Sequence, residues 1–303
     1  MIVDDLTSRA LASRLTGEGL RLRTGPVVNC IQSRLARVAE GIRLHYADYP
    51  IEEPGGFADF HVSVVPPHGL RRWAKPQVHF QFDGGRAFLP LPADQAFPML
   101  EWGLNWCVSG HCHQYLIVHA AVVERAGHAL LLPGPPGSGK STVCAGLILR
   151  GWRLLSDELA LLDFGTRCVV PLPRPVSLKN ASIEVIRRFS SEAVLGAPVH
   201  DTVKGSVAHM RPPAASVRRA SETARPRWIV LPRYEAGAAA ELAPLSKARA
   251  FMYLADQAFN YDVHGRRGFD FLADIVSACD CSELDYGNLE EAIALLDRLA
   301  TGK

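Results

Sequence analysis

The chain has 303 residues, of which 48% are hydrophobic and 21% are charged, with 25 glycines and 21 prolines. This composition is typical of a folded globular protein and excludes disordered, collagen-like and coiled-coil chains. The formal net charge of +2 gives no overall attraction to nucleic acid or to an anionic membrane, so we expect neither as a partner.

The amino-terminal segment and the cysteines indicate a cytoplasmic protein. Acidic residues stand where a signal peptide has basic and then apolar residues, and no run of about 18 apolar residues is present in the sequence. The seven cysteines are scattered and odd in number, which argues against a disulfide framework.

Residues 1–114 are predicted to form a β-rich amino-terminal region. The segments 60–64 and 77–82 alternate between apolar and polar residues with period two, and turn-forming residues separate them. A helix is predicted over 97–112, where apolar residues recur at helical spacing. This helix leads into the second part of the chain.

Residues 115–303 are predicted to form an α/β domain. Apolar strands are expected at 115–123, 129–132, 152–156, 228–231 and 282–286, a hairpin at 159–172, and helices at 141–150, 247–260, 269–278 and 289–300. Ser246 and Asn288 are the expected N-caps of the helices that follow them. The segment 196–227 is rich in arginine and lacks clear periodicity, so a long surface loop is predicted there.

A glycine-rich segment from Gly134 to Ser141 fits the pattern G-x-x-x-x-G-K-[ST] of a phosphate-binding P-loop. It lies between an expected strand and an expected helix, which is the context that this pattern requires. Backbone N–H groups of such a loop surround phosphate oxygens, Lys140 reaches the β- and γ-phosphates, and the Ser141 hydroxyl binds Mg²⁺. The predicted nucleotide-binding residues are Gly134, Pro135, Pro136, Gly137, Ser138, Gly139, Lys140, Ser141 and Thr142.

Two adjacent carboxylates, Asp157 and Glu158, follow the strand that comes after the P-loop helix. A carboxylate at the end of a neighbouring strand can face the metal ion and the γ-phosphate. Neighbouring residues of an extended strand point to opposite faces. Both carboxylates can therefore serve one site only if the strand ends at this point.

These motifs together resemble a known family. His119, the P-loop, the segment 150–154 and Ser156-Asp157-Glu158 occur in the order and spacing of the catalytic domain of bacterial HPr serine kinase/phosphorylase. Nearly the whole chain resembles the HprK-related kinase A family. The resemblance implies a P-loop kinase core similar to that of HPr kinase and phosphoenolpyruvate carboxykinase, and ATP- and Mg²⁺-dependent phosphorylation of a serine on a small protein or peptide. It also implies a homo-oligomer.

The resemblance implies roles for individual residues. Lys140 holds the phosphates, and Ser141 and Asp157 hold Mg²⁺. The family has two aspartates at the acidic pair and assigns the proton acceptor to the second, which here is Glu158, so either carboxylate stays open as the base. His119 is implied to lie beside the base, whereas a histidine in an apolar strand is more often a core residue. The family's second signature, linked to the phosphorylase reaction, is not found.

Other candidates and functions stay open. Lys204 and Arg211 are candidates for contacts with the transferring phosphoryl group, because a basic segment can close over a nucleotide, and a solvated loop is the alternative. Cys107 and Cys112 lack the second ligand pair of a structural zinc site, so packing is their expected role. The alternatives to a protein kinase are an ATP-binding regulatory switch without phosphotransfer and a small-molecule kinase. The presence of two carboxylates favours an enzyme, because a nucleotide-dependent switch needs only the carboxylate that faces the metal ion.

Overall fold

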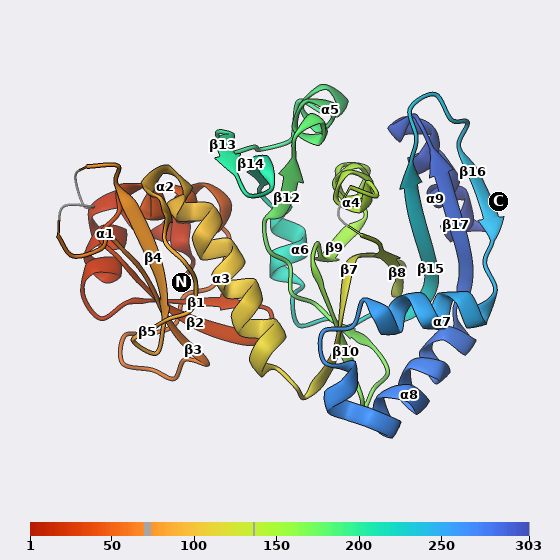
Figure 1. Cartoon of the computed structure of the whole chain (residues 1–303), viewed down its shortest axis with the longest axis horizontal. Coiled ribbons are helices and arrows are strands. Elements are labelled where there is room, and N and C mark those ends of the chain that lie inside the picture. Colours follow the sequence, from red (N-terminus) through yellow and green to blue (C-terminus); the bar gives the residue numbers. More distant parts are fainter. Residues whose placement is uncertain (70–73, 136, 303) are drawn as a thin grey trace.

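The computed structural model describes residues 1–69, 74–135 and 137–302. Within them the chain is a mixed α/β structure built on several sheets (Figure 1). The first sheet has six strands in the order β1-β2-β3-β4-β5, with β6 paired to β4. Its strands are β1 (Leu20–Thr24), β2 (Val27–Ser33), β3 (Phe60–Val65), β4 (Gln77–Phe82), β5 (Gly85–Arg86) and β6 (Leu91–Pro92).

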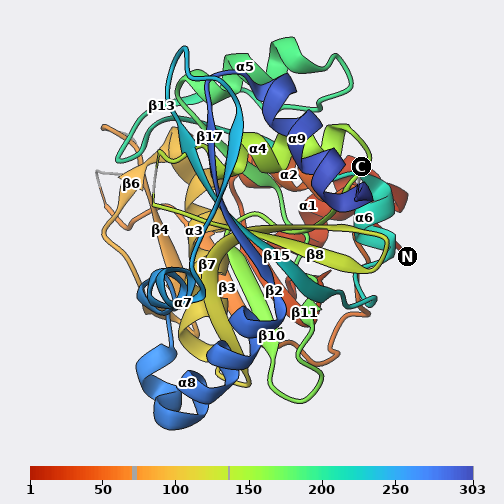
Figure 2. The same ribbon diagram turned by 90° about the vertical axis from the view of Figure 1, so that its right-hand side faces the viewer.

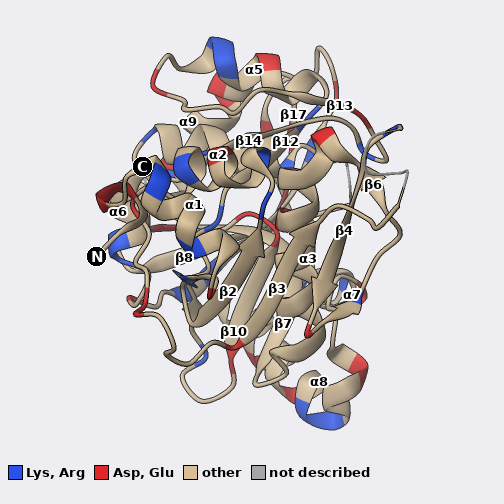
Figure 3. Ribbon diagram, turned by 90° about the vertical axis from the view of Figure 1, so that its left-hand side faces the viewer, with Lys and Arg blue, Asp and Glu red and all other residues tan. Residues whose placement is uncertain are grey.

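Three helices pack with this sheet: α1 (Ser8–Thr16), α2 (Ala36–His45) and α3 (Ala96–His111). Helix α3 confirms the helix predicted at 97–112, whereas the prediction of a β-rich region omits α1 and α2. Strands β2, β3 and β4 carry no Lys, Arg, Asp or Glu, so their ribbons are tan in Figure 3. Helix α3 contacts β3 and β4 closely, because a Cβ on Gly103 would lie 2.1 Å from the Phe80 ring.

The second sheet has eight strands in the order β11-β10-β7-β8-β15-β17-β16, with β9 paired to β7. The pairs β8–β15 and β15–β17 are parallel, and the others are antiparallel. Its strands are β7 (Tyr115–Arg125), β8 (His128–Pro133), β9 (Arg153–Ser156), β10 (Leu159–Asp163), β11 (Val169–Val170), β15 (Arg225–Tyr234), β16 (Glu241–Pro244) and β17 (Asp280–Tyr286).

Helices cover both faces of the second sheet (Figures 1 and 2). Alternate residues of β7 divide between two cores: Ala121 and Val123 lie under α4 (Lys140–Leu149) and α9 (Leu289–Thr301), whereas Ala120 and Val122 lie under α7 (Lys247–Asp256) and α8 (Tyr261–Ala278). A strand buried on both faces reads as the continuous apolar run seen in the sequence. The predicted caps are confirmed, since Ser246 accepts from Arg249 N–H and Asn288 accepts from Glu290 N–H.

The predicted long loop at 196–227 is wrong. This segment contains β13 (Val199–Thr202), β14 (Gly205–Met210), α6 (Ala214–Arg218) and the start of β15. Strands β13 and β14 join β12 (Val176–Lys179) in a third sheet of order β12-β14-β13, which lies beside α5 (Ala181–Phe189). Helix α8 also begins eight residues earlier than predicted, before a kink at Gly265.

None of the helices in the described ranges combines the length and the apolar character that crossing a lipid bilayer requires.

Two buried histidines, His45 in α2 and His209 in β14, lie against Phe97 with ring centroids 5.1 and 5.4 Å from it. Burial lowers the pKa of His45 to about 4 and that of His209 to about 3. The unfolded chain, in which these pKa values return to 6.5, therefore binds protons that the folded chain excludes. Their contribution to stability is complete above pH 6.5 and declines as the pH falls toward 4.

We predict that the free energy of unfolding falls in this pH window by up to about 1.4 kcal/mol per pH unit for each histidine. Urea unfolding at successive pH values measures the slope. The variant His45→Phe keeps an aromatic ring on Phe97 and removes one titrating group, so its slope should be smaller. Equal slopes in the two proteins would contradict this account.

Candidate active site

The loop 134–139 joins the end of β8 to the first turn of α4, in the position predicted from the sequence. Gly137 and Gly139 have φ values of 90° and 91°, which side chains rarely adopt. A Cβ on Gly139 would also lie only 2.0 Å from the Tyr286 hydroxyl. These glycines allow the backbone to turn into α4 at this point. Pro136 lies outside the described residues.

The loop is held by the ends of two strands of the second sheet. The hydroxyl of Tyr286, at the end of β17, donates to the carbonyl of Gly139 at 3.3 Å. The N–H of Tyr234, at the end of β15, donates to the carbonyl of Ser138 at 3.2 Å. These contacts hold the loop through its carbonyl groups, while within the loop the Ser138 N–H donates to the Pro135 carbonyl at 3.2 Å.

Lys140 is the first residue of α4 and is 6% exposed. Its ammonium group donates to the carbonyl of Gly134 at 2.9 Å, across the loop. Burial lowers the pKa of Lys140, while the negative charges of Asp157 and Glu158 oppose that effect. The amine therefore lies within electrostatic reach of both carboxylates.

The acidic pair lies between β9, which ends at Ser156, and β10, which begins at Leu159. Asp157 is 3% exposed, and its Oδ2 accepts the Ser177 N–H at 2.9 Å. Its Oδ1 has no hydrogen-bond partner among the described residues. Burial and the neighbouring charge of Glu158 raise the pKa of Asp157 to about 6.

Glu158 has a partner at each carboxylate oxygen. Oε1 lies 3.7 Å from the Lys179 ammonium nitrogen, and Oε2 accepts from the Asn105 amide at 3.4 Å. Burial would raise the pKa of Glu158, but the positive charges led by Lys179 and Lys204 outweigh it and hold that pKa below its ordinary value. Glu158 is therefore ionised at neutral pH, and its environment differs from that of Asp157.

A cavity of about 600 Å³ lies over these groups. The predicted residues that line it are His119, Gly137, Gly139, Lys140, Ser141, Thr142, Glu158 and Lys204. Gly134, Pro135, Ser138 and Asp157 do not line it. Its volume is within the range of small-molecule sites in proteins. One cavity is thus lined by residues from β7, from the turn before β10, from the P-loop and from the third sheet.

His119 and Lys204 line this cavity from different sheets. His119 lies in β7, and its backbone N–H donates to the carbonyl of Gln257. Burial and the charge of Lys140 lower the pKa of its imidazole ring to about 4. The ring is therefore neutral at pH 7. Lys204 lies in the turn between β13 and β14, with its ammonium nitrogen 5.1 Å from the centre of the Trp102 ring.

Arg211 is not brought to the cavity. Its guanidinium forms an ion pair with Asp48 at 2.6 Å, and both side chains are partly buried. Of the two basic candidates in the segment 196–227, only Lys204 lines the cavity.

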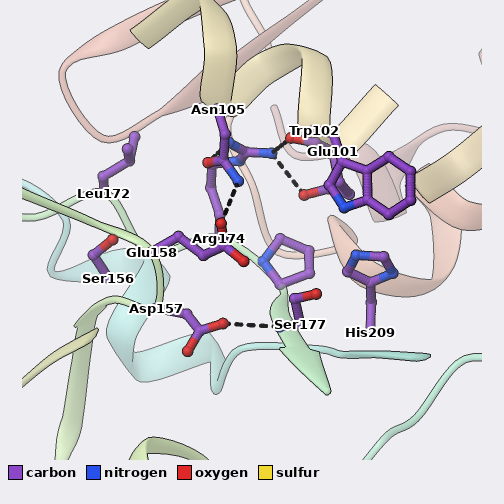
Figure 4. Close-up of a pocket in the computed structure, with 11 residues that line it drawn as sticks. Glu101, Trp102, Asn105, Ser156, Asp157, Glu158, Leu172, Arg174, Ser177 and His209 are labelled. Carbon is purple, nitrogen blue, oxygen red and sulfur yellow. Dashed lines mark hydrogen bonds and ion pairs between the residues drawn. The ribbon is translucent and has the colours of Figure 1, made fainter. Parts of the chain in front are cut away.

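A second, small cavity of about 20 Å³ lies on the α3 side of the acidic pair, and its lining side chains are drawn in Figure 4. Asp157 and Glu158 both line it, with Asn105 from α3 and Arg174 from the chain before β12. Arg174 is 5% exposed and forms an ion pair with Glu101 at 2.7 Å. Glu158 and Ser177 line both cavities.

Sequence reasoning missed Asn105 and Arg174, and it gave Lys179, Tyr234 and Tyr286 no committed role. A signal for Arg174 exists, because it is the one charged residue in the segment 169–178, between two prolines. A charge in an apolar segment requires a buried partner. Nothing in the local pattern around Asn105 indicates its contact with Glu158.

Comparisons with known proteins identify no family. No protein-family model matches the chain, and no curated protein sequence matches it. Among solved structures, the Hpr(Ser) kinase/phosphatase from Coxiella burnetii is similar over 62% of this chain and 99% of its own, with a TM-score of 0.26 and 11% sequence identity. A TM-score this low does not establish a shared fold.

The buried ion pair between Arg174 and Glu101 generates a prediction about stability. Arg174→Met would leave the Glu101 carboxylate buried without its guanidinium, which costs about 3–5 kcal/mol in comparable pairs. The matched control is Arg23→Met, because the Arg23–Glu52 pair has side chains 44% and 38% exposed and pairs of that kind contribute at most about 1 kcal/mol. Urea unfolding measures both. Equal losses in the two variants would contradict the prediction.

Proposed function

We propose that this protein is an ATP- and Mg²⁺-dependent P-loop kinase that phosphorylates a serine hydroxyl on a small protein or peptide. The observation that carries the proposal is that Lys140, Ser141 and Glu158 line one cavity over the P-loop and the first turn of α4. A P-loop supplies phosphate binding, and a carboxylate opposite it supplies a proton acceptor. The resemblance in sequence motifs supports the same activity.

The phosphate side of the site consists of backbone and ammonium groups. The loop's N–H groups and the positive end of the α4 dipole attract phosphate oxygens. Lys140 would exchange its contact with the Gly134 carbonyl for one with the β- and γ-phosphates. Lys179 and Lys204, which also line the cavity, would neutralise charge on the transferring phosphoryl group.

Glu158 is the proton acceptor in this proposal, because it is the member of the pair that lines the large cavity. Its carboxylate takes the proton of the acceptor hydroxyl as the hydroxyl oxygen forms a bond to the γ-phosphorus. The bond from that phosphorus to the β–γ bridging oxygen breaks, and ADP leaves with that oxygen. His119, which is neutral and lines the same cavity, would orient the hydroxyl or the base.

The residues present fit a magnesium ion. Asp157 has one carboxylate oxygen, Oδ1, without a hydrogen-bond partner among the described residues, and the Ser177 N–H holds the other. With the Ser141 hydroxyl, Asp157 would hold Mg²⁺ through water, because Asp157 does not line the cavity that Ser141 lines. A bound Mg²⁺ neutralises phosphate charge. The described residues contain no group of three or more His, Cys, Asp or Glu side chains arranged for a metal, so the phosphates and water would complete the coordination.

We further propose that 115–303 is the catalytic domain, that 1–114 is a distinct region packed on it, and that the acceptor is a small protein or peptide. An ATP-dependent switch and a small-molecule kinase are the competing functions. They differ from the proposal in where the γ-phosphoryl group goes, so a transfer assay separates them.

We predict transfer of label from γ-labelled ATP with Mg²⁺ to a serine of an acceptor in a cell lysate or a panel of small proteins. Lys140→Ala should abolish it, and Asp157→Asn/Glu158→Gln should reduce it by about 10²- to 10⁴-fold, the usual contribution of a general base. Arg211→Ala is the matched basic control, because Arg211 pairs with Asp48 away from the cavity, and it should retain transfer.

Three outcomes would contradict the kinase proposal. Tight ATP binding with only slow hydrolysis would favour the switch. Label on a small metabolite would favour a small-molecule kinase. Transfer that persists in both Lys140→Ala and the double carboxylate variant would exclude this cavity as the active site.

A further inference from the structure

We propose that Asn105 is a positioning residue for Glu158, and that the amino-terminal region thereby helps to orient the proposed proton acceptor. The inference rests on the proposed function and deepens it. It assigns a task to a helix, α3, that lies outside the predicted catalytic domain. Figure 4 shows the residues involved.

The orientation of the Asn105 amide is set by its neighbour Arg174. The Asn105 Oδ1 accepts from Arg174 Nη1 at 2.6 Å, and the Asn105 Nδ2 donates to Glu158 Oε2 at 3.4 Å. A guanidinium has only donors, so the amide atom that faces it must be the oxygen. The NH₂ group is then directed to Glu158 with no freedom to flip.

Arg174 is itself fixed on the other side. Its Nη2 donates to the carbonyl of Glu101 at 2.9 Å and to Glu101 Oε2 at 2.7 Å. The other oxygen of Glu101 accepts from the Tyr46 hydroxyl at 2.7 Å. Tyr46, Glu101 and Arg174 are 0%, 3% and 5% exposed. A chain of buried contacts therefore runs from the end of α2 through α3 to the acidic pair.

The contact from Asn105 restricts a glutamate side chain that is longer than an aspartate side chain. Glutamate has one more rotatable bond than aspartate, so its carboxylate can adopt more conformations. Lys179, at the end of β12, lies 3.7 Å from Oε1 and Asn105 holds Oε2. Partners on two different elements select one orientation of the carboxylate, and misplacing a reacting group by about 1 Å can cost about 100-fold in rate.

A purely structural role for Asn105 would be to satisfy Arg174. The variant Asn105→Asp separates the two roles. Aspartate has nearly the same shape and keeps an oxygen for Arg174, so the structural role survives. It presents a second carboxylate oxygen to Glu158, so the donor is lost and repulsion replaces it.

The first test measures transfer of label from γ-labelled MgATP to the serine acceptor that the wild-type protein labels, and it measures ATP binding by calorimetry. For Asn105→Asp we expect kcat to fall by about 10- to 100-fold, with the KM and the Kd for ATP within about twofold of wild type, because the phosphate-binding residues are unchanged. Gln114→Glu, which adds the same charge at an exposed position just after α3, should behave as wild type. Wild-type kcat in Asn105→Asp would overturn the positioning role.

The second test does not depend on turnover. In a double-mutant cycle, the loss of thermal stability caused by Asn105→Asp should be smaller in the Glu158→Gln background, because a glutamine amide can donate to the new carboxylate. Additive losses would overturn the contact. If the cycle shows the coupling but the wild-type protein neither binds ATP nor transfers its γ-phosphoryl group, the proposed function fails. The catalytic role of Asn105 then fails with it, while the contact stands.

Discussion

The buried guanidinium of Arg174 is the constraint around which the two parts of the chain are joined. A charge with so little exposure is tolerated only if ion pairs and hydrogen bonds replace its hydration. Glu101, Asn105 and Tyr46 supply those contacts, and all three belong to the amino-terminal region. The segment that leads into β12, and with it Lys179, is consequently fixed against α3 rather than against its own sheet alone.

Burial and neighbouring charges give the two adjacent carboxylates, Asp157 and Glu158, different pKa values. Asp157, enclosed and beside another negative charge, has its pKa raised to about 6, whereas lysine charges keep the pKa of Glu158 low. Pairs of titratable groups whose environments separate their pKa values are typical of sites that divide acid–base or metal-binding tasks. Lys140, Lys179 and Lys204 leave the large cavity with more positive than negative groups, which suits an anionic ligand.

Much of the second sheet could be predicted because its signals are local. The apolar runs of β7 and β8, the glycines before α4 and the caps Ser246 and Asn288 each fix structure through near neighbours. The hairpin β13–β14 could not. Its turn consists of Val203 and Lys204 rather than the glycine and asparagine that mark tight turns, and β13 has exposed polar residues, so the segment resembles a loop until β12 provides its partner.

Some residues of the candidate site could likewise be predicted from the sequence, and others could not. Lys140, Ser141 and Glu158 could be placed together because a motif and a strand end bring them to one edge of a sheet. The proposal of Glu158 over Asp157 as the proton acceptor rests on the cavity, which the sequence does not reveal. Asn105 is 53 residues from Glu158 and 69 from Arg174 in the sequence, so no periodicity reports the contact. Of these contacts, the sequence indicates only that of Arg174, because a single charged residue between Pro173 and Pro175 in an apolar segment requires a buried acceptor. Candidate acceptors are then the carboxylates of predicted buried helices, and Glu101 is the carboxylate within the helix predicted at 97–112.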